Sequence, residues 1–319
     1  MAVNYNDLDH ALFFTLSYSD NFVFPLKEEE IKDRLPKVWD WNFLTASSDS
    51  TKKTPINKNN LKKSLEKLES NQIIKKLKTN NSAYYFLKNR QHLVQLRLNK
   101  IDAAKKRQLA IKEACQWLKR FPSIKALALT GSSAVNKADF ADDLDFCLIV
   151  QKNTLWITRF FVILLAKILG KQPQIDAQAK KNKIHAWCFN LWLDEGSLNI
   201  TKRGSSIYQA YEIKQMRWLF DRANIQEKIV SANSKLAQMI DLYLNKQQLV
   251  KFENGSNSYL LLAINYLFFL MQNIYRRIFF GEENFLLDLS QAHFNDVRRQ
   301  KGIFEYIKKI MKTNDFLDF

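Results

Sequence analysis

The scarcity of glycine and proline constrains the fold of this chain more than any other feature of its sequence. Seven glycines and five prolines occur in 319 residues, which is under a third of their usual combined share of roughly 12%. Tight hairpin turns depend on these two residues, so a many-stranded sandwich or barrel is not expected. The 46% hydrophobic content excludes a disordered chain. We therefore predict an α+β fold that is mostly helical, with a small sheet.

The cysteines, histidines and apolar stretches give no sign of a disulfide framework, a metal site or a membrane span. Cys115, Cys147 and Cys188 lie far apart in apolar stretches, and the four histidines lack metal-ligand spacing. We expect buried free thiols in a reducing cytoplasm. The N-terminus lacks a secretory signal. The apolar stretches Leu155–Leu169 and Tyr259–Phe280 are interrupted by basic residues, so we predict no membrane partner.

The net charge of +17 is concentrated in one block of the chain. Residues 51–120 carry 19 basic and 4 acidic side chains, whereas residues 1–50 carry 4 basic and 9 acidic ones. A concentrated basic block is typical of a surface that binds a polyanion such as nucleic acid, although a solvated lysine-rich surface gives the same pattern.

Residues 1–90 show helical spacing over 6–18, 26–35 and 55–68, followed by two short β-prone runs, 73–78 and 83–87, around an asparagine-rich turn. This order resembles a winged-helix domain. In such domains the third helix enters a major groove and the hairpin contacts phosphates, although others act as scaffolds or protein-binding modules. The predicted nucleic-acid-binding residues are Lys58, Lys62, Lys63, Lys67, Lys75 and Lys76.

The segments on either side of the centre of the chain are predicted to be helical. Residues 88–120 contain no glycine or proline and indicate one long helix or two joined end to end, so residues 91–121 are interpreted as a helical linker. Residues 204–319 are predicted to form a helical C-terminal region, with helices over 208–220, 225–244, 256–279 and 302–312, and their regularly spaced aromatics are expected in the core.

The chemistry is concentrated in residues 122–203. A buried strand over 124–130 leads into Gly131, Ser132 and Ser133, and a second buried strand follows Asp143-Leu-Asp145. Glycine allows a phosphate to approach the backbone, and a serine hydroxyl at a helix start can bind phosphate oxygens. Residues two apart on a strand face the same side, so Asp143 and Asp145 should converge on one Mg²⁺ or Mn²⁺ ion.

This pattern resembles the nucleotidyltransferase superfamily, which has the polymerase β-like fold. The matching residues are Leu129-Thr-Gly-Ser132 and Asp143-Leu-Asp145, about ten residues apart. The resemblance implies a small mixed-sheet nucleotidyltransferase core over 122–203, a nucleoside triphosphate (NTP) at Gly131, Ser132 and Ser133, and metal ligation by the two aspartates. The segments 155–159, 188–193 and 208–216 also resemble prokaryotic chains that place a winged helix before such a core.

One position departs from the superfamily pattern. The superfamily has a third carboxylate on a later strand, but the candidate strand here, 185–193, carries Asn190 at its centre. An asparagine can offer a carbonyl oxygen but cannot act as a base. Asp176 and Asp194 are alternative third carboxylates, and Lys152, Arg159 and Lys171 are candidates for steering the NTP.

The sequence thus predicts a Mg²⁺-dependent enzyme that transfers a nucleotidyl group from an NTP to a hydroxyl acceptor. The acceptor, which could be a nucleic acid, a protein or a small molecule, stays open. The alternative is a non-catalytic, nucleotide-sensing and DNA-binding regulator with a degenerate site. Asn190 and the basic winged helix favour that alternative, whereas the intact Asp143 and Asp145 pair favours the enzyme.

Overall fold

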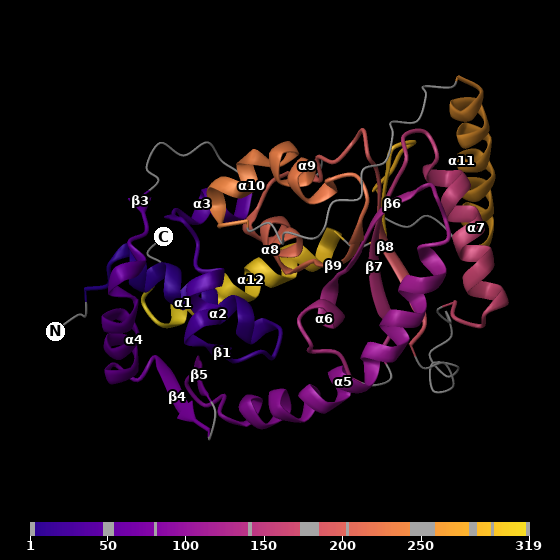
Figure 1. The fold of residues 1–319 in the computed structure, drawn as a ribbon. Helices are drawn as coiled ribbons and strands as arrows, with labels where there is room; N and C mark the ends of the chain where they lie inside the picture. The colour runs from indigo at the N-terminus through magenta and orange to yellow at the C-terminus, as the bar shows by residue number, and fades with distance from the viewer. Residues whose placement is uncertain are drawn as a thin grey trace.

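The computed structural model describes residues 4–46, 54–79, 82–139, 142–172, 185–201, 204–242, 259–280, 286–294 and 297–316. It confirms an α+β fold in which helix predominates (Figure 1). We call residues 4–87 the N-terminal unit. Its elements are α1 (Asp7–Asn21), β1 (Leu26–Lys27), α2 (Glu28–Arg34), β2 (Val38–Trp39), α3 (Trp41–Ala46), β3 (Thr54–Pro55), the 3-10 helix η1 (Lys58–Asn60), α4 (Leu61–Ser70), β4 (Ile74–Lys78) and β5 (Ala83–Leu87).

The hairpin expected in the N-terminal unit is present as β4 and β5, with Ile74 opposite Leu87 and Lys78 opposite Ala83. The sequence did not indicate β1, which pairs with β5 and completes a three-stranded sheet in the order β1-β5-β4. It also did not indicate the two-stranded ladder of β2 and β3. The expected three helices correspond to α1, α2 and α4, with α3 as an addition.

Helix α5 (His92–Leu118) leads from the N-terminal unit to the central sheet (Figure 1). Of the two alternatives that the sequence left open, the structure has the single long helix. The sheet is mixed and has six strands in the order β10-β11-β8-β7-β6-β9. Strands β6 and β7 are antiparallel, whereas β7 and β8 are parallel. The elements in and around its centre are β6 (Ile124–Leu129), α6 (Gly131–Ala134), β7 (Leu144–Val150), α7 (Leu155–Ile168) and β8 (Trp187–Asp194).

The two faces of the sheet are covered by different parts of the chain. Ala126 and Ala128 of β6 belong to a core shared with the N-terminal unit and the later helices. Leu127 and Leu129 belong to a second core with α5 and α7. Because alternate residues of a strand face opposite sides, burial on both sides explains why the strands are apolar throughout.

The prediction of a purely helical C-terminal region is wrong, because three strands from it extend the sheet. Residues expected to continue a helix to 220 instead form β9, which pairs with β6. Trp218 and Phe220 alternate with less buried residues, which is the strand period. The remaining elements are α8 (Ile207–Gln215), β9 (Arg217–Asp221), α9 (Ile225–Ala232), α10 (Ser234–Met239), α11 (Tyr259–Phe280), β10 (Leu286–Leu287), β11 (Gln291–His293) and α12 (Val297–Thr313).

The helix expected over 225–244 divides into α9 and α10 at Asn233. The buried Asn233 amide donates to the carbonyl oxygens of Leu198 and Ile229, and its Oδ1 accepts from the backbone N–H of Ile200. These bonds tie the helix break to the preceding loop.

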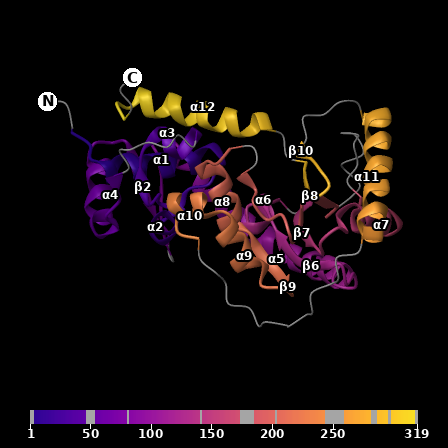
Figure 2. The same ribbon diagram turned by 90° about the horizontal axis from the view of Figure 1, so that it is seen from above.

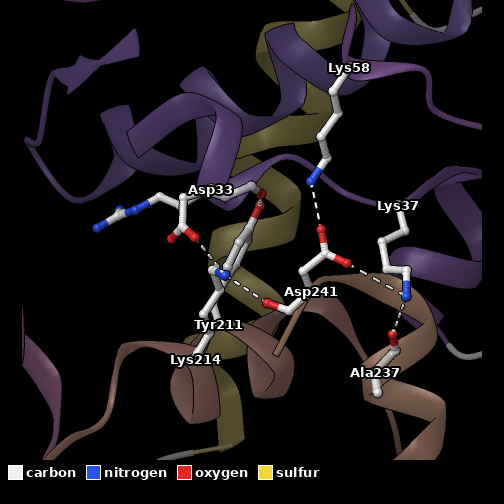
Figure 3. A network of polar contacts seen from close by, with 8 residues as sticks. Asp33, Lys37, Lys58, Tyr211, Lys214, Ala237 and Asp241 are labelled. Atoms are coloured by element: carbon white, nitrogen blue, oxygen red, sulfur yellow. Dashed lines mark hydrogen bonds and ion pairs between the residues drawn. The ribbon is translucent and has the colours of Figure 1, made fainter. Parts of the chain in front are cut away.

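The first and last helices of the chain, α1 and α12, pack against each other. Helix α12 lies alongside the N-terminal unit in both ribbon views (Figures 1 and 2), and the Phe316 ring stacks on Phe13 and Tyr5 with centroids 4.2 Å apart in each case. Polar contacts add to this packing: the Tyr211 hydroxyl of α8 donates to the Arg34 carbonyl oxygen at 2.7 Å (Figure 3). The N-terminal unit is therefore packed against α8, α10 and α12.

Helices α7 and α11 lie side by side at the end of the molecule remote from the N-terminal unit (Figures 1 and 2). The aromatics of α11 were expected in the core, which is wrong for three of them: Tyr259, Tyr266 and Tyr275 are 90%, 46% and 56% exposed. Phe268 and Phe269 do pack against the second core. Among the described residues no helix is long and apolar enough to cross a bilayer.

Candidate functional site

The predicted strand, glycine and short helix form a sharp turn at the end of β6. Thr130 is extended, and its backbone N–H donates to the Asp145 carbonyl oxygen at 2.9 Å. Gly131 has φ +58° and opens α6. A positive φ is costly for a residue with a Cβ atom, so glycine suits this corner.

A second reason requires glycine at position 131. A Cβ atom placed there would lie 2.8 Å from Oδ2 of Asp145 and 3.4 Å from its Cγ. The Asp145 carboxylate therefore lies directly over the Gly131 backbone. Asp145 occupies the same strand phase as Cys147 and Ile149, whose side chains face the core shared with the N-terminal unit.

Asn190 meets Asp145, as the parallel pairing of β7 and β8 allows. Its Nδ2 donates to Oδ1 of Asp145 at 2.6 Å. Asp145 pairs with Cys188, but the register shifts after Phe146 and Phe189, so that Cys147 pairs with Leu191 and Asn190 is the extra residue of a β-bulge. Bulges near functional sites re-aim side chains. The Cys188 thiol donates to Oδ1 of Asn190 at 3.1 Å, so the asparagine carbonyl oxygen already has a partner.

The electrostatics of Asp145 follow from this packing. Burial raises the pKa of Asp145 to about 6, the Asn190 hydrogen bond opposes the rise, and the Asp143 charge adds to it. Asp143 thus lies within electrostatic range of Asp145. A carboxylate desolvated in this way gains stability from a nearby cation.

Ser133 does not have the role expected for it. It is 5% exposed, its hydroxyl accepts from Nη2 of Arg107 at 2.7 Å, and it lies 3.3 Å from the Asp143 carbonyl oxygen. The buried Arg107 of α5 also donates to the carbonyl oxygens of Asp142 at 2.9 Å and Asp143 at 2.8 Å. Ser133 and Arg107 therefore hold the loop that carries Asp143, whereas Gly131 and Ser132 line the adjoining cleft.

That cleft has a volume of about 270 Å³ and is formed by elements far apart in the sequence. Asp145 and Asn190 come from the sheet, and Glu212 faces the cleft from α8. The N-terminal unit supplies a wall with Tyr18, Phe22, Phe24 and Arg34, and α12 contributes Arg299.

Three cations line the cleft: Arg34, Lys137 and Arg299. Lys137 Nζ and the Arg299 guanidinium lie 5.1 Å and 5.9 Å from the Phe22 ring centroid. Burial, together with the charges of Lys100, Arg299 and Arg34, lowers the pKa of Lys137 to about 8. In the part of the chain that the structure describes, no carboxylate forms an ion pair with any of the three. The Asp145 and Glu212 carboxyl groups line the same cleft, so side chains of both charge signs face it.

Sequence reasoning missed Glu212. Burial raises the pKa of its carboxyl group to about 7, the Arg299 charge opposes the rise, and the Asp145 charge adds to it. No local motif marks position 212, because α8 reaches the site only through the packing of the sheet against the N-terminal unit.

The predicted metal ligands are two carboxylates, Asp143 and Asp145, of which Asp145 lines the cleft. In the described ranges no group of three His, Cys, Asp or Glu residues is close enough to hold a metal. Mg²⁺ commonly takes one or two carboxylates and fills its other positions with water and phosphate oxygens. Asn190 presents its N–H group to Asp145, so it brings no further ligand oxygen to this side.

The predicted nucleic-acid-binding lysines divide into two groups. Lys58 Nζ forms an ion pair with Asp241 at 2.8 Å (Figure 3), and Lys67 Nζ forms one with the buried Asp9 at 2.6 Å. Lys76 lies over the Tyr85 ring at 5.1 Å. These three are engaged within the chain, whereas Lys62, Lys63 and Lys75 are exposed.

The residues proposed to steer the NTP, and the alternative carboxylate Asp194, are not in the cleft wall. Lys171 Nζ lies 3.3 Å from a Glu113 oxygen, and Lys152 packs near Gly196. Arg159 lines a different cavity. The Asp194 carboxylate accepts from the backbone N–H groups of Asn153 and Gly196 at the far end of β8. Asp176 lies outside the described residues.

The three cysteines have different surroundings. Cys147 is buried, as expected, whereas Cys115 and Cys188 are half-buried, and none of the three forms a disulfide.

Comparison with protein-family models, curated proteins and solved structures gave no match.

Proposed function

We propose that this protein is a metal-dependent nucleotidyltransferase that moves a nucleotidyl group from an NTP to a hydroxyl acceptor. One observation carries the proposal: Gly131 after β6, Asp145 of β7 and Asn190 of β8 meet in a cleft that also holds three cations without carboxylate partners among the described residues. The proposal includes a nucleotidyltransferase core over residues 122–203 and a winged-helix domain over residues 1–90.

The residues have separate roles in this proposal. Gly131 and Ser132 border the path of the phosphates, and Arg34, Lys137 and Arg299 balance their negative charge. Asp143 and Asp145 hold one Mg²⁺ or Mn²⁺ ion. When bound, that ion neutralises phosphate charge and favours departure of pyrophosphate. Asn190 orients the Asp145 carboxylate.

A proton acceptor is needed for the acceptor hydroxyl, and Asn190 cannot serve. Glu212 is the carboxyl in the cleft wall best placed for this role. A pKa of about 7 gives it both protonation states near neutral pH, which is where general-base catalysis is most effective.

The N-terminal unit has a direct part in this site. Phe22 and Arg34 of this unit line the cleft. Nucleotide binding in the cleft is therefore coupled to the position of the N-terminal unit. Binding of a nucleic acid through Lys62, Lys63 and Lys75 is a separate proposal, supported by the charge of residues 51–120.

Incubation with labelled NTPs, Mn²⁺ or Mg²⁺, and candidate nucleic acids, proteins and small molecules tests the activity. We expect label transfer by the native chain and none by Asp143→Asn or Asp145→Asn, with unchanged circular dichroism. A different outcome would favour the regulator: the native chain binds nucleotide only with metal, the two variants lose this binding, and no transfer occurs. The Asn190 amide in place of a carboxylate also favours the regulator. Nucleotide affinity unaffected in the double variant would contradict both hypotheses.

A further inference from the structure

A second cavity lies between α7 and α11, with a volume of about 480 Å³. It shares no lining residue with the cleft around Asp145. Its walls are largely apolar side chains, among them Trp156, Phe160, Ile163, Leu164 and Phe294.

The Arg159 guanidinium lines this cavity together with two other cations, Lys167 and Arg276. Nη1 of Arg159 donates to Oε1 of Gln272 at 2.5 Å. The guanidinium lies 4.6 Å from the Phe294 ring centroid and 5.6 Å from that of Trp156. Nε is buried and has no hydrogen-bond partner among the described residues. Those residues also give Arg159 no carboxylate partner.

Arg159 is half-buried, and its Nε atom is withdrawn from water. A cation partly withdrawn from water without a counter-charge is costly, and proteins commonly pair such a group with an anion. Burial, with the nearby Arg276 charge, lowers the pKa of Arg159 to about 9. Within the described residues, the cavity therefore combines a guanidinium that has no carboxylate partner with room for a ligand, and a bound anion would supply that counter-charge.

The apolar part of the cavity lining indicates which kind of group would be attached to the bound anion. Leu164, Met271 and Tyr275 line it and are also 42%, 44% and 56% exposed, so the cavity opens onto the surface shared by α7 and α11. Apolar side chains continue beyond the opening, with Ile274 at 57% and Ile278 at 70% exposure. A hydrocarbon chain would cover these side chains and remove apolar area from water.

We propose that this cavity binds an amphipathic anion, with a carboxylate or phosphate head at Arg159 and an alkyl body between α7 and α11. This site is independent of nucleotidyl transfer. It also gives Arg159 a role other than the NTP steering that the sequence suggested.

Calorimetric titration of the full chain tests the proposal with four probes below their micelle concentrations: dodecanoate, dodecyl phosphate, dodecanol and inorganic phosphate. We expect the first two to bind, and dodecanol and inorganic phosphate to bind at least about tenfold more weakly, since each lacks one half of the recognised chemistry. The tighter of the two amphiphiles distinguishes a carboxylate ligand from a phosphate ligand.

Arg159→Gln should weaken the amphiphiles at least about tenfold and bring their affinity to that of dodecanol. The matched control is Arg277→Gln, which removes an exposed arginine of α11 that does not line the cavity, and it should bind as the native chain does. If Arg159→Gln fails to fold, Ile163→Trp, which fills the cavity, serves instead. Equal affinity for dodecanol and dodecanoate, or unchanged binding in Arg159→Gln and Ile163→Trp, would overturn the proposal.

Discussion

Replacing Gly131 by alanine should separate two demands that the site makes on this residue. Its φ of +58° disfavours any side chain, and its Cβ atom would lie 2.8 Å from Oδ2 of Asp145. Gly170 is a natural control, because its φ is +65° but nothing lies within 4 Å of a Cβ atom there. Comparing Gly131→Ala with Gly170→Ala isolates the contact with Asp145.

The expected magnitudes follow from this geometry. The left-handed conformation costs an alanine about 1–2 kcal/mol, and the loss of unfolded-chain freedom returns about 0.4–1 kcal/mol, so Gly170→Ala should lose at most about 1.5 kcal/mol of unfolding free energy. In Gly131→Ala the carboxylate must also move away from Asn190, which holds it at 2.6 Å. A hydrogen bond to a charged group contributes about 1.5–3 kcal/mol, so the total loss should be about 2–4 kcal/mol.

Urea denaturation of both variants measures this difference, and Mn²⁺-dependent nucleotide binding gives a second readout. Gly131→Ala should lose binding because Asp145 is displaced, whereas Gly170→Ala should retain it. Equal destabilisation of the two variants, with nucleotide binding preserved in both, would refute the close contact between Gly131 and Asp145.

Further expectations concern Glu212, Asn190 and the surface lysines. The folded-state pKa of Glu212, about 7, is above its ordinary value of 4.5, so this group stabilises the fold at low pH and that contribution is lost as pH rises through 7. Glu212→Gln should therefore gain on the order of 1–2 kcal/mol relative to the native chain between pH 5 and pH 8 in urea titrations, and an identical pH dependence would contradict the burial of Glu212. Asn190→Asp removes the donor to Asp145 and adds a carboxylate. Calorimetry should therefore show tighter Mn²⁺ binding, and the rate of transfer should rise by as much as about 10²-fold. Weaker Mn²⁺ binding would count against the proposed metal position. The double variant Lys62→Ala, Lys63→Ala should reduce the slope of log affinity for a duplex against log salt concentration by about 0.9 for each phosphate that is no longer neutralised. Lys58→Ala should lower stability and leave that slope unchanged, because the Lys58 ammonium contacts Asp241.

Local patterns were sufficient to place the centre of the candidate site. The strand period and the apolar runs predicted β6 and β7. The spacing of Gly131 and Asp143 placed the segment that connects these two strands. The pattern also placed Asn190 on a later strand, but its contact with Asp145 depends on the bulge that shifts the register of β7 and β8. These features depend on residues close in sequence or on adjacent strands, where the geometry is fixed by the backbone.

Local patterns failed where long-range pairing decides the conformation. Residues 217–221 carry a helix-compatible pattern but become β9 because the free edge of β6 offers hydrogen bonds, and a strand gains more from such pairing than its propensity indicates. Ser133 looked like a phosphate ligand because it follows Gly131, but Arg107 of α5 holds its hydroxyl.

The sequence by itself determined the helical character of the chain, the strands around the aspartates and the glycine corner beside them. Only the tertiary structure decided what surrounds Asp145: Arg34 from the N-terminal unit, Glu212 from α8 and Arg299 from α12. The same packing set Lys58 and Lys67 against carboxylates and, within the described residues, left Arg159 without one. The physical reason is that the charge state and the partners of a side chain depend on which distant segments pack around it. Hydrophobic burial is non-directional, so the periodicity of the sequence does not show which segments those are.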